Sequence, residues 1–342
     1  MTEQKTAEIV AVTKSEFVEE TEKTFDLTEA GKAVVTVSNV SGAVMVEAWD
    51  QPTVHVRAVK RARSQRSFDR TRVEMSQSGE QITVRTVIDE EAIVAGVMDF
   101  LRGERAGATV EYALKVPAAC AVRAKTVNGS VTLAGLSNQS EANSVNGMVR
   151  LSSLAGQAVG STVNGTLEAD SLAGSAELRT VNGSLILKTA QLRQLDARTV
   201  SGNIRAELNV DPEGAYSFNS TNGDCALILP PGSRCTITMQ AVNGGVECAL
   251  PHKTLASEMR PAFSRWEGAV NGGGTPVSFR TINGRLRVTS AGPETPDEPQ
   301  AEPAMGEAVA PQEERSTMEI LQAIERGELT VEQAMQKLKE RK

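Results

Sequence analysis

The sequence predicts an all-β protein, a parallel β-solenoid (β-helix) with rungs of roughly 18–21 residues, followed by a small α-helical hairpin on a disordered linker. Three observations carry this prediction. A four-residue motif, Thr-Val-Asn-Gly, recurs along the chain. Each copy is followed by residues that alternate between apolar and polar, as in a strand with one buried face. Aromatic residues make up only 3% of the 342 residues, so the core is built from Val, Leu, Ile and Ala, a composition that favours sheets.

The motif has a constant spacing over its first four copies, which begin at Thr126, Ser144, Thr162 and Thr180. The same residue types at the same offsets are what stacked repeats produce. Because stacked strands lie ~4.8 Å apart, equivalent Asn amides can hydrogen-bond from rung to rung. Later copies begin at Thr199, Ser220, Ala241, Ala269 and Thr281, and an earlier echo is Asn39-Val40-Ser41-Gly42. The predicted corner ladder consists of Asn128, Asn146, Asn164, Asn182, Ser201, Asn222 and Asn243.

The alternation also predicts which side chains enter the core. Counting from the Ser or Thr of each copy, the motif Val and the apolar residues five and seven places later fall on one face, for example Val127, Val131 and Leu133. The Ser/Thr and Asn positions fall on the other face. We therefore expect the motif Val to point inward and the Ser/Thr to point outward. The Gly that follows Asn supplies the backbone freedom that a sharp corner requires.

An antiparallel meander is the alternative architecture. Asn-Gly between apolar strands is also the strongest short hairpin signal. Additional turn signals such as Leu172-Ala173-Gly174 lie midway between Asn-Gly pairs, as a meander with two turns per period requires. The constant spacing of the first four copies favours the solenoid.

The chain divides by composition into five parts. The linker is defined by an abrupt gain of Pro and acidic residues. The predicted parts are a poorly ordered acidic segment (1–32), irregular N-terminal β turns of the solenoid (33–125), the regular solenoid (126–290), the linker (291–315) and the helical hairpin (316–342).

Two stretches interrupt the early β-structure. Residues 57–72 contain seven cations, one Asp and a single aromatic ring, Phe68. Surfaces that bind nucleic acid interleave cations with stacking aromatics, so a solvated hairpin face is the favoured interpretation. Residues 92–101 have the pattern of a short amphipathic helix. Such a helix could dock on a membrane, but a cap over the open end of the solenoid core is favoured.

The C-terminal hairpin is marked by clear helix signals. Ser316-Thr317-Met318-Glu319 is a capping box, Gly327 ends the first helix, and Thr330 opens the second. A segment this short cannot bury a stable core alone, so we expect the hairpin to pair with a copy of itself or with a protein partner. The candidate contact residues are Ile320, Leu321, Ile324, Leu329, Val331, Met335 and Leu338.

The sequence lacks the common signatures of enzymes. It contains two His, His55 and His252, and no HExxH, GxSxG, P-loop or GxGxxG motif, so we expect no catalytic residues, no cofactor and no metal. The four Cys form no CxxC pair, which indicates buried reduced thiols. The net charge of −7 disfavours nucleic acid as a partner. Without a signal peptide or a membrane-spanning segment, the expected location is the cytoplasm, with peripheral envelope association as an alternative.

Two other functions stay open. A carbohydrate-active or carbohydrate-binding β-helix needs clustered carboxylates on one face. The outward position six of successive copies is instead mixed: Thr132, Arg150, Glu168, Ile186, Arg205, Ala226 and Glu247. An extracellular adhesin or ice-binding solenoid needs a flat Thr array, which the Ser/Thr position of the motif approaches.

The repeats, preceded by the segment Tyr112-Ala113-Leu114-Lys115-Val116-Pro117, resemble the bacterial adhesin-like, autotransporter-head-like β-solenoid domain. The tail that begins Met318-Glu319-Ile320-Leu321 is similar to the SHOCT-like helical hairpin of the YvlB and LiaX group. This resemblance implies a non-enzymatic protein, tied in some members to the cell-envelope stress response and to antimicrobial-peptide sensing. No catalytic residues belong to the family motif. The hairpin lies at the C-terminus here, which departs from the LiaX arrangement.

Overall fold

The computed structural model describes residues 17–88, 108–260 and 263–290. The chain separates into two compact units, Met1–Ala291 and Gly292–Lys342, and every described residue belongs to the first. The predicted linker (291–315), the hairpin (316–342) and the amphipathic segment (92–101) lie outside the described residues.

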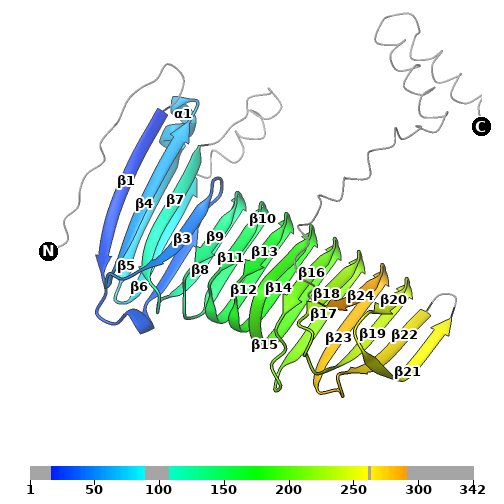
Figure 1. Cartoon of the computed structure of the whole chain (residues 1–342). Helices are drawn as coiled ribbons and strands as arrows, with labels where there is room; N and C mark the ends of the chain where they lie inside the picture. Colours follow the sequence, from blue (N-terminus) through cyan, green and yellow to red (C-terminus); the bar gives the residue numbers. More distant parts are fainter. Residues whose placement is uncertain (1–16, 89–107, 261–262, 291–342) are drawn as a thin grey trace, which may run out of the picture. The chain divides into compact units, whose positions relative to one another are not determined.

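The first unit is a solenoid, so the predicted fold class is confirmed. Each regular rung contributes one strand to a face that we call sheet A and one to a face that we call sheet B, and Figure 1 shows these strands side by side. The interior strands of both sheets pair in parallel. The interior of sheet B is β8 (Ala121–Asn128), β10 (Ser140–Asn146), β12 (Ala155–Asn164), β14 (Ala173–Asn182), the second half of β15 (Leu185–Ser201) and β17 (Ala215–Asn222). The interior of sheet A is β9 (Val131–Ala134), β11 (Val149–Ser152), β13 (Leu167–Asp170), the first half of β15, β16 (Ile204–Leu208) and β18 (Cys225–Leu229).

The core consists of aliphatic ladders between the two sheets. In sheet A, Val131, Val149, Leu167, Leu185 and Ile204 pair in register, and all five are at most 1% exposed. Unbroken alternation within each strand turns every second residue to this interior. The constant spacing of the motif therefore translates directly into columns of like side chains.

The predicted orientation of the motif is wrong at two positions. Thr162 is 2% exposed and points into the core, whereas Val163 is 38% exposed and points outward. The reason lies at the corner, the turn at Asn-Gly that links each sheet B strand to the next sheet A strand. In the first regular copy the inward residues are Ala124 and Thr126 before the corner but Val131 after it. Gly129 and Ser130, which lie between the two strands, shift the inward–outward alternation by one residue. The alternation of one strand therefore cannot be extended through the turn into the next strand.

The order of rungs along the stack departs from chain order near the C-terminal end. Strands β23 (Thr275–Asn283) and β24 (Leu286–Ser290) form one rung. This rung is inserted between the rung of β17 and β18 and the rung of β19 (Cys235–Asn243) and β20 (Val246–Cys248), although β19 and β20 precede it in the chain. The rings of Phe218 and Phe279 stack across this insertion, 4.7 Å apart and nearly parallel. The motif copy at Ala269 forms no rung, because it lies at the end of the antiparallel strand β22 (Phe263–Val270).

Antiparallel strands cover both ends of the stack. At one end β22 is followed by β21 (His252–Arg260). At the other end a rung of β2 (Val34–Ser38) and β3 (Val44–Trp49) adjoins the regular rungs, and β6 (Gln81–Ile88) and β7 (Thr109–Pro117) lie beyond it. The outermost strands are β5 (Thr71–Ser78), β4 (Thr53–Ala62) and β1 (Phe17–Asp26), with the short helices η1 (Ala30–Lys32) and α1 (Gln65–Arg70).

The structure corrects the prediction for part of the N-terminal segment. The sequence predicts poor order for residues 1–32, but Phe17–Asp26 form strand β1, which pairs along its whole length with β4. This strand is acidic and only Phe25 is buried, so its order comes from a distant partner rather than from local propensity. Within the described ranges, no helix is long and apolar enough to cross a membrane.

Candidate interaction surface

The corners of the solenoid are held by three kinds of bond between rungs. The Ser144 and Thr162 hydroxyls donate to the carbonyls of Gly129 and Gly147 at 2.8 and 2.9 Å. The backbone N–H of Gly147 donates to the carbonyl of Asn164 in the next rung at 3.1 Å. Over the rungs from Thr126 to Thr199 the inward Ser/Thr therefore has a structural task, because its buried hydroxyl finds an acceptor one rung away.

The third bond joins the Asn side chains. Nδ2 of Asn146, Asn164 and Asn182 donates to Oδ1 of the preceding Asn at 2.9, 2.9 and 3.0 Å, beginning at Asn128. Ser201 takes the next place in register but is too short to continue the amide chain. The ladder resumes beyond it with bonds from Asn283 to Asn222 at 2.7 Å and from Asn243 to Asn283 at 3.0 Å. Asn243 thus follows Asn283, which sequence reasoning did not place in the ladder.

The corner glycines pack backbone against backbone. A Cβ atom added to Gly165 would lie 2.1 Å from the carbonyl oxygen of Gly147, and similar contacts recur at Gly147 and Gly129. Glycine is required here by space, since a side chain would have to push adjacent rungs apart. The corner consequently fixes the residues beside it with little freedom to rearrange.

Beside each corner, the motif Val stands on the outer surface. We call this line of side chains the valine ridge; its Thr and Asn neighbours are paired in register from rung to rung. Its aliphatic members are between 38% and 46% exposed, and Thr221 occupies the one polar place. Continuous apolar lines on a surface mark interaction sites more often than scattered residues do. In stacking order, the ridge is Val127, Val145, Val163, Val181, Val200, Thr221, Ile282 and Val242.

A groove of about 440 Å³ runs along the ridge. One wall consists of Val163, Val181 and Val200, and the other includes Arg179 and Arg198. The guanidinium groups turn away from the ridge: Arg198 binds Asp196 through two bonds of 2.9 and 2.7 Å, and Arg179 pairs with Glu177. The groove therefore presents valine methyls and arginine methylenes together with Ser161 and Asn219, while the charges of the two arginines are neutralised by their own strands.

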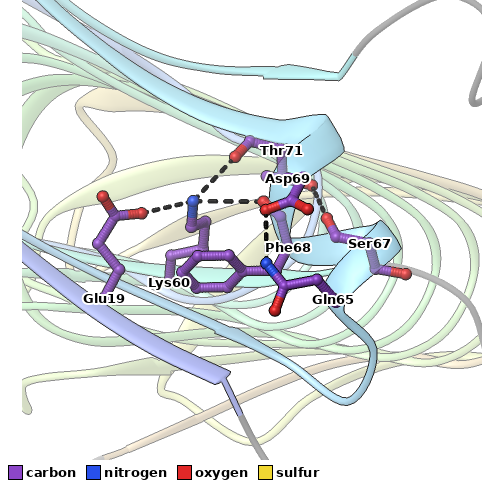
Figure 2. Close-up of polar contacts among 7 residues, drawn as sticks. All are labelled: Glu19, Lys60, Gln65, Ser67, Phe68, Asp69 and Thr71. Atoms are coloured by element: carbon purple, nitrogen blue, oxygen red, sulfur yellow. Dashed lines mark hydrogen bonds and ion pairs between the residues drawn. The ribbon is translucent and has the colours of Figure 1, made fainter. Parts of the chain in front are cut away.

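Two cations of the basic stretch 57–72 are paired with acidic residues of strand β1, while most of the others are exposed. Arg57 pairs with Glu20, and the carboxylate holds the pKa of Arg57 above its usual range. Figure 2 shows Lys60, whose ammonium group pairs with Glu19, donates to the carbonyls of Phe68 and Thr71 at 3.3 and 3.1 Å, and lies over the Phe68 ring. Lys60 is only 7% exposed, which differs from the predicted solvated hairpin face. Through these bonds Lys60 of strand β4 holds the C-terminal end of helix α1 in place.

Lys60→Met is expected to lower the free energy of unfolding by about 1–3 kcal/mol, because it leaves the Glu19 carboxylate without its partner and removes the donor to two carbonyls. Trypsin should then cut faster at the arginines around α1. The measurement is urea unfolding combined with limited digestion. Arg85→Met is the control, because its pair with Glu74 is exposed and should contribute less than ~1 kcal/mol. Equal effects of the two variants would contradict the structural role of Lys60.

Among the described residues, the carboxylates on the outer face of sheet A do not form an acidic cluster. Charges at position six pair across rungs, as in Arg150 with Glu168 at 2.8 Å and Arg287 with Glu247 at 3.0 Å. Over residues 17–88, 108–260 and 263–290, no three His, Cys, Asp or Glu side chains are grouped so as to hold a metal ion. The predicted hairpin contacts between Ile320 and Leu338 lie outside these ranges.

The buried cysteines are expected to be unreactive. Burial raises the pKa of the Cys225 thiol to about 12 and the pKa of the Cys120 and Cys235 thiols to about 11. Because the thiolate is the nucleophile, these thiols should react with iodoacetamide at pH 8 at least ~100-fold more slowly than a free thiol. Mass spectrometry of protein alkylated before and after unfolding checks this. Labelling of native Cys225 at the rate of a free thiol would contradict its burial.

The family model described as Toastrack DUF4097 matches residues 34–262, about two thirds of the chain, from β2 to the end of β21. The chain belongs to the Toastrack DUF4097 family. The comparison with curated proteins found no significant match. This Toastrack protein is also similar to three solved structures. The one from Bacteroides fragilis NCTC 9343, a "putative adhesin", is 9% identical over 79% of this chain and 96% of that chain, with a TM-score of 0.47.

The second, from Parabacteroides merdae ATCC 43184, is also described as a "putative adhesin". It is 8% identical over 80% of this Toastrack chain and 96% of its own, with a TM-score of 0.39. The third, from Parabacteroides distasonis ATCC 8503, is described as a "putative lipid binding protein". It is 12% identical over 80% of this chain and 97% of its own, with a TM-score of 0.29.

Proposed function

We propose that this Toastrack protein is a non-enzymatic interaction scaffold that binds a partner along the valine ridge. The observation that carries the proposal is the line of half-exposed aliphatic side chains held in register beside the Asn ladder. Because hydroxyl, backbone and amide bonds join the corners from Asn128 to Asn182, the ridge there cannot rearrange to hide its methyl groups. Covering it with another surface removes apolar area from water without deforming the rungs.

The second part of the proposal concerns the tail. Residues 316–342 carry the apolar pattern of a helical hairpin and mediate self-association or docking to a protein. A tethered hairpin has a high effective concentration once the scaffold is bound, so the two contacts reinforce each other. The resemblance to the YvlB and LiaX group supports a link to bacterial cell-envelope stress, with the protein in the cytoplasm or peripherally at the envelope.

The proposal is tested by copurification from native cells, with and without cell-wall antibiotic stress. The tagged full chain is compared with a ridge variant, Val163→Thr, Val181→Thr and Val200→Thr together. Ile186→Thr is the matched control, because Ile186 has an outward position in sheet A of the same region. We expect the ridge variant to lose a partner that the control retains. Identical sets of recovered proteins, together with release of reducing ends from a polysaccharide, would overturn the proposal in favour of a carbohydrate-active protein.

A further inference from the structure

The side chains of the valine ridge are spaced as regularly as the strands of a β-sheet, unlike those of an irregular apolar patch. It contributes one side chain per rung, and its neighbours Thr162 and Thr180 or Asn164 and Asn182 are paired directly. The side chains therefore recur every ~4.8 Å along the stack. Five consecutive rungs, from Val127 to Val200, carry valine without interruption. A surface that covers all five in register must have the same repeat.

We propose that the ridge of one chain packs against the ridge of a second copy, related by a two-fold axis perpendicular to the stack. This inference rests on the proposed function, since it names the partner of the same surface. A second copy has a repeat equal to that of the ridge, because both copies carry the same ladder. Side chains of two such ladders interdigitate in a dry contact, as they do between paired sheets with this spacing.

The shape of the surface fits this contact. A two-fold interface uses the same patch on both subunits, so the patch must be complementary to itself. The ridge and the groove of about 440 Å³ lie side by side on sheet B, and they allow each ridge to enter the groove of the other copy. Val163, Val181 and Val200 line the groove as well as forming the ridge. Each copy thus contributes one ridge and receives one.

The charges beside the groove do not oppose the contact. The Arg198 guanidinium is held in two bonds by Asp196, and Arg179 is paired with Glu177 within the same chain. Each pair joins residues two places apart on one strand, so the guanidinium groups are neutralised within the chain. Two copies then meet through valine methyls, arginine methylenes and the small polar side chains of Ser161 and Asn219, which also line the groove. Because each arginine is paired with a carboxylate, these four residues add no net charge beside the groove. The arginines of two facing copies therefore do not repel each other strongly.

The helical hairpin predicted for residues 316–342 would fit the ridge less well. An α-helix advances 5.4 Å per turn, whereas the ridge advances ~4.8 Å per rung. Over four intervals the two repeats differ by ~2.4 Å, about half a rung, so helical side chains drift out of register with the valines. The hairpin remains an outcome that the experiment distinguishes.

Light scattering and sedimentation of three full-length variants test the proposal. We expect the native chain and a hairpin variant, Ile320→Asp with Ile324→Asp, to have twice the monomer mass. The ridge variant, Val163→Thr, Val181→Thr and Val200→Thr, should dissociate with a dissociation constant about tenfold or more higher. Ile186→Thr should behave as the native chain. Threonine is β-branched and close to valine in size, so the variant should fold, and circular dichroism verifies this.

Three results would overturn the pairing of ridges. A monomeric native chain would exclude it. A dimer that survives the ridge variant but not the hairpin variant would assign self-association to residues 316–342. Loss of the dimer in both variants would indicate a hairpin bound to the ridge of the other copy. If the native chain is monomeric and the ridge variant still loses a partner in cells, this inference fails while the proposed function stands.

Discussion

Gly165→Ala is expected to lower the free energy of unfolding by roughly 3 kcal/mol or more. The new Cβ would lie 2.1 Å from the Gly147 carbonyl oxygen, which is a backbone atom and cannot swing aside. These two rungs would have to separate locally, which would lengthen the bonds from Gly147 N–H to the Asn164 carbonyl and from Thr162 to the Gly147 carbonyl. Urea unfolding followed by circular dichroism measures the loss.

Gly31→Ala is the matched control. Nothing lies within 4 Å of the Cβ that would be added to Gly31, so the change should alter stability by less than about 1 kcal/mol. If Gly165→Ala were as mild as Gly31→Ala, the close stacking of corner glycines would be contradicted.

Phe279→Ala is expected to lower the free energy of unfolding by about 3–5 kcal/mol. Phe279 is 1% exposed within the stack, so removing its ring leaves a large cavity. Its ring stacks on Phe218 at 4.7 Å, so the two residues should also be coupled. A double-mutant cycle should give about 0.5–1.5 kcal/mol for the pair of rings. Unfolding of the native chain, both single variants and the double variant measures this coupling.

This cycle also tests the order of the rungs. If rungs followed chain order, Phe218 would lie beside the rung of Met239, and Phe218 and Phe279 would not touch. Leu255→Ala serves as a control for loss of an apolar side chain, because Leu255 is 52% exposed and its truncation should cost less than about 1 kcal/mol. Additive effects of the two Phe substitutions would contradict the insertion of β23 between β17 and β19.

The regular part of the fold could be predicted because its repeats are local and alike. The equal spacing of the motif from Thr126 to Thr180 determines the register of neighbouring rungs. The inserted rung could not be derived in the same way, since β23 pairs with strands far away in the chain. One signal was present: Thr281 follows Ala269 too closely in the sequence for a full rung to fit between them.

Strand β1 was missed for a related physical reason. Its acidic sequence has little apolar alternation, and its order depends on pairing with β4 from Phe17 opposite Ala62 to Asp26 opposite Thr53. Acidic side chains on β1 also meet cations on β4, as with Glu20 and Arg57. The acidic and basic segments could have been matched by charge, but no local pattern in either segment identifies the other as its partner.

The ridge was missed because alternation was counted through the corner. Within β8 the alternation is regular, with Val122 and Ala124 inside, and it places Thr126 inside as well. Counting backward from Val131 instead assigns Val127 to the interior. The polarity of Thr made that assignment attractive, but its hydroxyl is satisfied by a carbonyl of the neighbouring rung. The groove depends on rotamers set by ion pairs and has no sequence signal.

Photo-cross-linking in cells tests the central claim, that the valine ridge is the contact surface, most directly. A photoactivatable residue replaces Val181 in one strain and Ile186 in another, and the full chain is detected after irradiation. We expect a discrete cross-linked species from position 181 and none from position 186. No cross-link from position 181, or equal yields from both positions, would contradict it.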